Sequence, residues 1–283
     1  LRNYLFRIFV PTMPIISITS DWGGENYRLP VLKGMIRSSL DSIENGPVQA
    51  MCQIEELSCS IKPFDIRSAC FILRHSFVYF PKGSVHLLCV RCESLSEEGV
   101  VVVEMSGHFF VGANDGRFSL LADEIPSTAY EISADSDSGC TAKLFVKAVQ
   151  EIISGKLSEN RVVALKRVAR EVPVVMKDKI IGHVVFIDSY GNAITDISKS
   201  LFVKSFLSVR GIIGRDPNFT IFVHGPYLEF DSICSNYTDI ESGATAAIFN
   251  SLDLLEIGIR NGNFSAMENI DTTTEITIQW RII

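Results

Sequence analysis

The chain has 283 residues, of which 47% are hydrophobic, and a formal net charge of −7. This length and apolar content suffice for one large or two medium cores, which excludes overall disorder, and no apolar run approaches the ~20 residues that cross a bilayer. The acidic balance argues against a dedicated nucleic-acid binder, because such proteins need a basic surface to displace counterions.

Residues 1–12 are mildly apolar and contain neither a long apolar run nor a small-residue cleavage site. We therefore expect an N-terminal extension of unknown role before Met13 rather than a signal peptide. The seven cysteines are odd in number and scattered, and several lie in apolar runs, as is typical of reduced thiols. Together these features predict a cytoplasmic protein.

From Met13 to residue 157, strand-like and helix-like segments alternate. The expected strands are the apolar runs 15–19, 85–90 and 100–105. The expected helices are 29–43, the segment opened by 63–65, and 141–154, which Gly155 ends. The near-continuous apolar runs are typical of strands covered on both faces. Residues 13–157 therefore predict an α/β domain with a mostly parallel sheet between helices.

Residues 158–179 are charged and weakly patterned, and we expect them to form a linker. From residue 180 onward, short apolar segments are separated by turn signals such as Gly191-Asn192. The expected strands are 184–187, 193–197, 220–223, 228–230, 245–249, 255–259 and 276–282. Residues 180–283 therefore predict a smaller all-β domain, a barrel or a sandwich.

Asp21 follows the first predicted strand directly, in Ser20-Asp21-Trp22-Gly23. In open α/β folds the carboxyl edge of the strands is where ligands bind, although a turn acid that caps the next helix explains an isolated Asp equally well. Trp22 favours a ligand with a flat face and hydroxyl groups. A carboxylate can accept hydrogen bonds from a ribose diol while the ring covers apolar surface.

Asp188 and Asn192 flank a tight Tyr190-Gly191 turn. A β-hairpin with left-handed positions explains this pattern without a ligand. As a binding site, the acid would accept from a ligand ammonium, and the amide would offer a donor and an acceptor. Asn250-Ser251 ends another apolar run and is consistent with either a turn or a site.

Other candidate motifs are weak. Arg67 lies in the first turn of its predicted helix beside Asp65, where an exposed ion pair contributes little. The lone C-x-x-C at Cys89 and Cys92 lacks the second pair that a zinc site needs. The five histidines show no ligand spacing, so we expect no metal.

Taken in order, these stretches resemble the family of S-adenosylmethionine (SAM) hydroxide adenosyltransferases, which also includes fluorinating and chlorinating enzymes. The resemblance runs from about Met13 to the C-terminus. It rests on segments similar to family motifs: Ile18–Gly23, Tyr27–Gly34, Pro63–Ala69, Phe80–His86, Phe110–Gly116, Ile187–Asn192 with Thr195, and Phe249–Ile257.

The resemblance implies a two-domain protomer that forms a homotrimer, with SAM between the N-terminal domain of one subunit and the C-terminal domain of the next. It implies that Asp21, beside Trp22, holds the ribose diol and that Asp188 takes the methionine ammonium. The remaining contacts to the nucleoside and amino-acid ends would come from Asn192, Asn250 and Ser251, with Tyr237 stacked on adenine. SAM would be the substrate, and no separate cofactor would be required.

The departures from the family pattern fall on the groups that activate water. Of the family's Asp–Arg–His set, only the Arg matches, as Arg67, while the acid position falls at Ser60 and the His position at Cys140. Thr141 falls where fluorinating members carry a halide-contacting Ser. The family loop Val-Asp-Pro-Gly-Val-Gly becomes Val90–Leu95.

The leading hypothesis is therefore attack of water or hydroxide at the ribose C5′ of SAM, giving adenosine and L-methionine. A catalytically weak or inactive SAM- or adenosine-binding protein is the alternative. A SAM-dependent halogenase is a third possibility.

Overall fold

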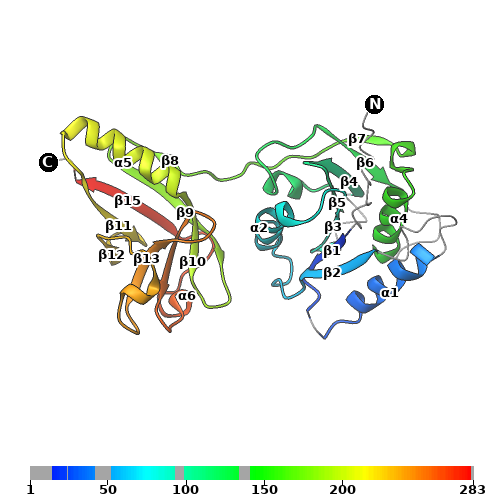
Figure 1. The fold of residues 1–283 in the computed structure, drawn as a ribbon, viewed down its shortest axis with the longest axis horizontal. Coiled ribbons are helices and arrows are strands. Elements are labelled where there is room, and N and C mark those ends of the chain that lie inside the picture. The colour runs from blue at the N-terminus through cyan, green and yellow to red at the C-terminus, as the bar shows by residue number, and fades with distance from the viewer. Residues whose placement is uncertain (1–14, 24, 42–51, 93–98, 134–140, 282–283) are drawn as a thin grey trace, which may run out of the picture. The chain divides into compact units, whose positions relative to one another are not determined.

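The computed structural model describes residues 15–23, 25–41, 52–92, 99–133 and 141–281, and the chain divides into two compact units between Ala169 and Arg170 (Figure 1). Residues 1–12, Cys140 and the ends of two predicted elements, at 42–43 and 282, lie outside the described residues. Within the described part, no helix is long and apolar enough to span a membrane.

The N-terminal unit is built on a seven-stranded sheet with strand order β2-β1-β3-β5-β4-β6-β7. The strands are β1 (Ile15–Ser20), β2 (Gln53–Ser58), β3 (Val85–Cys89), β4 (Val100–Met105), β5 (His108–Ala113), β6 (Thr128–Ile132) and β7 (Val162–Ala164). The predicted strands at 15–19, 85–90 and 100–105 are all present, whereas β2, β5, β6 and β7 were not predicted as strands.

The predicted parallel arrangement holds for one half of this sheet. β2, β1, β3 and β5 pair in parallel, but β5, β4, β6 and β7 pair antiparallel. The reason is the two-residue connection Ser106-Gly107, whose φ angles of 52° and 75° form a tight hairpin. So short a loop can join only antiparallel strands.

Helices cover both faces of this sheet. They are α1 (Arg28–Asp41), α2 (Ile66–Ser76) and α4 (Thr141–Ile153), with short 3-10 turns η2 (Phe77–Tyr79), η4 (Arg117–Leu120) and η5 (Leu157–Glu159). Along β4, Val100 and Val102 join the core on the side of α1 and α4, while Val101 and Val103 join the core on the side of α2 (Figure 1). This alternation accounts for the unbroken apolar run in the sequence.

The predicted linker, 158–179, contains secondary structure. β7 pairs with β6 in the N-terminal unit, and β8 (Val174–Val175) pairs with β9 in the C-terminal unit. Asn114 fixes the stretch after β7, because its side chain donates to the carbonyl of Ala164 (3.0 Å) and accepts from the amide of Lys166 (2.9 Å).

The C-terminal unit holds an eight-stranded sheet, in the order β12-β11-β15-β9-β10-β14-β13, with β8 beside β9. Its further strands are β9 (Lys179–Ile187), β10 (Ala193–Ser198), β11 (Asn218–Val223), β12 (Leu228–Phe230), β13 (Thr245–Phe249), β14 (Leu254–Ile259) and β15 (Glu275–Arg281). The strands pair antiparallel, so the β-rich character of this unit is confirmed.

The unit also has helices, which corrects the all-β prediction. They are α5 (Lys199–Ile213), the one-turn α6 (Phe264–Met267) and the 3-10 turns η6 (Gly225–Tyr227) and η7 (Tyr237–Asp239). Ser198 caps the start of α5, and Gly214 ends it at a φ of 73°. Phe202 and Phe206 of α5 pack against the buried Trp280, so the helix closes the core of this unit.

Candidate functional site

Asp21 lies directly after β1, at the carboxyl edge of the parallel half of the N-terminal sheet. Its Oδ2 accepts hydrogen bonds from the backbone amides of Phe64 (2.9 Å) and Arg91 (3.1 Å). Both donors have positive φ, 69° and 49°, a conformation that non-glycine residues keep mainly where function or tight structure requires it. Among the described residues, the hydrogen bonds to this carboxylate both reach Oδ2, so Oδ1 can accept from a ligand.

Trp22 is only 9% exposed and packs into the core on the side of α1 and α4. It also lines an open cavity of about 560 Å³ together with Gly23, Glu25, Asn26 and Tyr27. Because the core takes most of the indole surface, Tyr27, at 72% exposure, offers more aromatic area to this cavity than Trp22 does.

Three of the residues predicted to activate water lie in the described part of the N-terminal unit. Ser60 follows β2 and is exposed, and the amide of Gly23 donates to the neighbouring carbonyl of Cys59 (2.8 Å). Arg67 is exposed in the first turn of α2, which begins beside Phe64 and so beside Asp21. Thr141 begins α4 and is half-buried.

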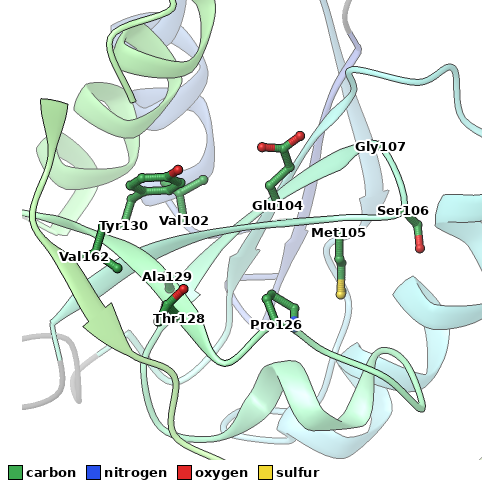
Figure 2. A pocket seen from close by; sticks show the side chains of 10 residues that line it. All are labelled: Val102, Glu104, Met105, Ser106, Gly107, Pro126, Thr128, Ala129, Tyr130 and Val162. Atoms are coloured by element: carbon green, nitrogen blue, oxygen red, sulfur yellow. The ribbon is translucent and has the colours of Figure 1, made fainter. Parts of the chain in front are cut away.

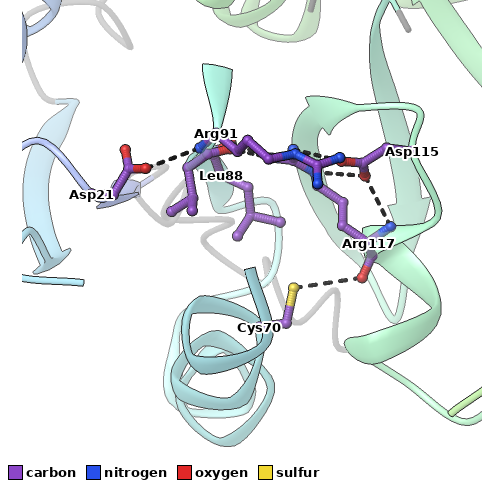
Figure 3. A network of polar contacts seen from close by, with 7 residues as sticks. Asp21, Cys70, Leu88, Arg91, Asp115 and Arg117 are labelled. Carbon is purple, nitrogen blue, oxygen red and sulfur yellow. Dashed lines mark hydrogen bonds and ion pairs between the residues drawn. The ribbon is translucent and has the colours of Figure 1, made fainter. Parts of the chain in front are cut away.

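A buried ion pair, which the sequence did not predict, is connected to Asp21 through Arg91. Asp115 and Arg117 join through two parallel hydrogen bonds, Nε to Oδ1 (2.9 Å) and Nη2 to Oδ2 (2.9 Å) (Figure 3). Burial favours a raised pKa for Asp115, but the hydrogen bonds and charge of Arg117 outweigh it and lower that pKa. Asp115 could have been singled out from the sequence, because it falls in the motif Phe110–Gly116.

In the C-terminal unit, a cavity of about 690 Å³ brings together three predicted residues, Asp188, Asn192 and Tyr237. Arg260 and Asn263 line it too, and sequence reasoning missed both. The fold brings these residues together, since Tyr237 is far in sequence from the turn that carries Asp188 and Asn192. Asn250 and Ser251 are not among the described residues that line this cavity.

Asp188 is held by the turn that it begins. Its Oδ1 accepts from the amides of Tyr190 (2.9 Å) and Asn192 (2.9 Å), and its Oδ2 accepts from Asn192 Nδ2 (3.0 Å). Gly191 has a φ of 84°, and a Cβ there would collide with the side chain of Asn263. The tight turn between β9 and β10 that the sequence predicted is therefore present, and its residues Asp188, Tyr190 and Asn192 also line the cavity of about 690 Å³.

Tyr237 is fixed by a buried carboxylate, Glu256, which is 7% exposed. Its two oxygens accept from the Tyr237 hydroxyl (3.0 Å) and from Asn250 Nδ2 (3.0 Å). Burial raises the pKa of Tyr237, and the negative charge of Glu256 raises it further. Asn250 in turn caps the 250–254 turn, in which Ser251 is exposed.

Gly258 on β14 leaves the space that this arrangement needs. A Cβ at this position would overlap Asn192 Oδ1 and the Tyr237 hydroxyl and would lie 2.9 Å from Asn192 Cγ. Neither Glu256 nor Gly258 was predicted as a site residue, although Glu256 lies in the motif Phe249–Ile257.

Another cavity, of about 330 Å³, lies over β4 and β6 of the N-terminal unit and is lined by Glu104, Tyr130 and Val162 among others (Figure 2). None of the predicted site residues is among the described residues that line it. In the described ranges, no group of three or more His, Cys, Asp or Glu side chains is arranged to hold a metal ion.

The fold and its carboxylate sites define a two-unit protein with an α/β unit followed by a β-rich unit, each carrying an acid fixed by backbone amides. This chain belongs to the SAM hydroxide adenosyltransferase family. Residues 16–160 match the model of the SAM hydroxide adenosyltransferase N-terminal domain, and residues 182–277 match that of the C-terminal domain. The resemblance inferred from the motifs is thus confirmed, and SAM is the substrate of this family.

Individual relatives agree with this assignment. The (R)-S-adenosyl-L-methionine hydrolase of Methanocaldococcus jannaschii is 25% identical over 268 residues, covering 94% of this chain and 96% of that protein. The crystal structure of an uncharacterized conserved protein from Thermotoga maritima is similar, with a TM-score of 0.73, 22% identity and coverage of 94% of this chain and 99% of that one. A conserved hypothetical protein from Thermus thermophilus gives a TM-score of 0.69, 19% identity and coverage of 95% and 100%. At these identities the two structures show the fold alone.

Proposed function

We propose that this protein hydrolyses SAM, with water or hydroxide attacking the ribose C5′ to give adenosine and L-methionine. Family membership and the activity of the M. jannaschii relative support the reaction. The observation that carries the proposal is the cavity of about 690 Å³ in the C-terminal unit. It gathers Asp188, Asn192 and Tyr237, three residues that the motif resemblance assigns to the ligand.

In this proposal the two acids bind different parts of the ligand. Oδ1 of Asp21 accepts from the ribose hydroxyls, with Trp22 beside it, and Asp188 accepts from the methionine ammonium. Tyr237 presents its ring to adenine while Glu256 holds its hydroxyl. Asn192, Asn250 and Ser251 supply the remaining polar contacts.

The chemistry demands little from the protein. The water oxygen forms a bond to C5′, the C–S bond breaks with its electron pair going to sulfur, and methionine leaves as a neutral thioether. The water proton passes to solvent. Since no leaving group needs protonation, holding water in line with the C–S bond in a site that excludes bulk solvent supplies much of the acceleration.

Arg67 stabilises the hydroxide-like nucleophile in this proposal, and Ser60 or Thr141 orients it. The family His falls at Cys140, for which we propose no basic role. General-base help is ordinarily worth ~10²–10⁴-fold in rate. We therefore expect turnover that is slow for this family and not abolished.

We also propose a homotrimer in which the N-terminal unit of one subunit faces the C-terminal unit of the next. The support is that the two ligand-binding acids lie in separate units and that the cavity beside each is open, so that neither alone would enclose SAM. A cytoplasmic location is proposed because the six cysteines that the structure describes are all free thiols.

A second function has its own supporting observation. The acid and the His of the family's water-activating set are replaced by Ser60 and Cys140. The loss of both favours a SAM- or adenosine-binding protein with weak or no catalysis.

Incubation of the purified protein with SAM, with and without chloride, followed by liquid chromatography, separates these functions. Adenosine and methionine above the blank support hydrolysis, and a chlorinated nucleoside would instead identify a halogenase. Binding by calorimetry with no product would leave the binding protein. Absence of both binding and product would refute the proposal. An Arg67→Ala variant should bind SAM normally and lose turnover.

A further inference from the structure

Arg117 is a buried cation, with 2% of its surface exposed, and all three of its guanidinium nitrogens donate hydrogen bonds. Besides its two bonds to Asp115, its Nη1 donates to the carbonyls of Leu88 (3.1 Å) and Val90 (3.0 Å). The register between β3 and β5 ends at Leu87 and Val111, so Arg117 binds the β3 backbone where strand pairing stops. A buried guanidinium is costly unless it is paired and satisfied, and Arg117 meets both conditions.

The peptide unit between Val90 and Arg91 links this cation to Asp21. The carbonyl of that unit, on Val90, accepts from Arg117 Nη1. Its N–H, on Arg91, donates to Asp21 Oδ2 (3.1 Å), as Figure 3 shows. Because a peptide is planar, fixing its carbonyl also fixes the direction of its N–H. Polarisation of the carbonyl by a cation strengthens the donor at the other end of the unit.

Asp115 completes the arrangement and is itself buried, with 5% of its side chain exposed. It holds the Arg117 fork bidentately and also accepts from Arg91 Nη2 (3.3 Å). The side chain and the amide of Arg91 are thus both held, one by Asp115 and the other by Asp21. A small residue makes room for the Arg117 stem, since a Cβ on Gly112 would lie 3.2 Å from Arg117 Cδ.

We propose that Arg117, paired with Asp115, is a positioning residue for Asp21. It orients the Val90–Arg91 peptide, whose N–H sets the carboxylate that grips the ribose. The inference rests on the proposed function, because it concerns the residue assigned there to the ribose diol. It goes further by giving a buried ion pair a role in nucleoside affinity in addition to its role in the core.

The test is ribose discrimination, measured by calorimetry as the ratio of the dissociation constants of 2′-deoxyadenosine and adenosine. This ratio reports how well the Asp21 carboxylate is placed, and global stability does not change it in the folded protein. Arg117→Lys keeps the charge and loses the bidentate fork. We expect it to lower the ratio about 10-fold, the size of one lost hydrogen bond to a charged group. Asp115→Asn should shift the ratio in the same direction.

Arg161→Lys is the matched control, because it makes the same change in an exposed ion pair of the same unit, and it should leave the ratio unchanged. In an Asp21→Asn background, Arg117→Lys should have no further effect on the ratio. If the unaltered protein binds neither nucleoside, or binds both equally, the proposed ribose role of Asp21 fails. If it discriminates, and folded Arg117→Lys discriminates equally well, only the positioning role is overturned.

Hydrogen exchange of the unaltered chain tests the same inference if both variants fail to fold. The Arg91 amide should exchange as slowly as the amides of β3. Fast exchange there, with β3 protected, would overturn the proposal.

Discussion

Acid should destabilise the N-terminal unit through His86, which lies fully buried on β3. Its Nδ1 is 2.7 Å from Ser17 Oγ and its Nε2 is 3.3 Å from Nδ1 of His108, which is also buried. Phe77 and Phe110 pack against the His86 ring. Burial lowers the pKa of His86 to about 3, and its neighbour His108 acts in the same direction.

The sign and size of the effect follow from proton linkage. The ordinary histidine pKa of about 6.5 applies to the unfolded chain, which therefore takes up a proton as the pH falls through that value. The folded chain takes up this proton only near pH 3. Stability is thus full above pH 6.5 and falls as the pH drops toward 3. Between pH 7.5 and pH 5, His86 alone should remove about 2 kcal/mol from the free energy of unfolding.

The assay is urea unfolding at several pH values, followed by tryptophan fluorescence, since Trp22 lies in this unit and Trp280 in the other. His86→Gln removes the titration, and the loss between pH 7.5 and 5 should shrink by about 2 kcal/mol relative to the unaltered chain. His224→Asn is the control, because His224 is exposed at a φ of 52° that Asn also adopts. Equal pH dependence of the unaltered chain and His86→Gln would refute the reasoning.

Three further predictions concern the ligand sites. Gly258→Ala should lower the free energy of unfolding by about 1–3 kcal/mol, because the added Cβ displaces Tyr237 and Asn192. Calorimetry should also show weaker adenosine binding to this variant, and unchanged affinity would contradict the placement of Tyr237 and Asn192 in the binding site. Glu256→Ala leaves the Tyr237 hydroxyl without its acceptor, so the melting temperature of this variant should fall well below that of Glu256→Gln, whose amide oxygen can still accept from that hydroxyl. Equal melting temperatures would argue against a stabilising hydrogen bond between Tyr237 and Glu256. Asp21→Ala should abolish nucleoside binding in calorimetry while Cys140→Ala barely changes it, and the reverse pattern would mean that the pocket is misplaced.

The elements that the sequence predicted are those whose pattern is local. The apolar runs place β1, β3 and β4 correctly, and the helix start predicted at 63–65 places α2. The parallel prediction failed at Ser106-Gly107, where a two-residue turn reverses the chain, because alternation of elements says nothing about loop length. Helix α5 was missed because its Phe, Val and Ser residues are not strong helix formers. Packing of Phe202 and Phe206 on Trp280, which joins residues distant in the sequence, contributes to holding this helix.

The candidate site divides in the same way. Asp21 and Asp188 could be singled out as candidates because an acid at the end of a strand is a local signal. Glu256 was not, since a carboxylate inside a strand normally faces solvent. It is buried here because donors from Tyr237 and Asn250 converge on it, and convergence of distant residues cannot be read from spacing. Arg117 was missed for the same reason.

Asp21 and Asp188 lie in different units and are nevertheless held alike, each by two backbone amides on a single oxygen. Backbone donors lose no side-chain entropy, so both acids are oriented before a ligand arrives. The proposed function assigns binding of the ligand to these two acids and the rate of water attack to Arg67 with Ser60 or Thr141. Under this proposal, replacement of the family acid and His by Ser60 and Cys140 lowers the rate and leaves the affinity unchanged. For this reason binding and turnover have to be measured separately in this protein.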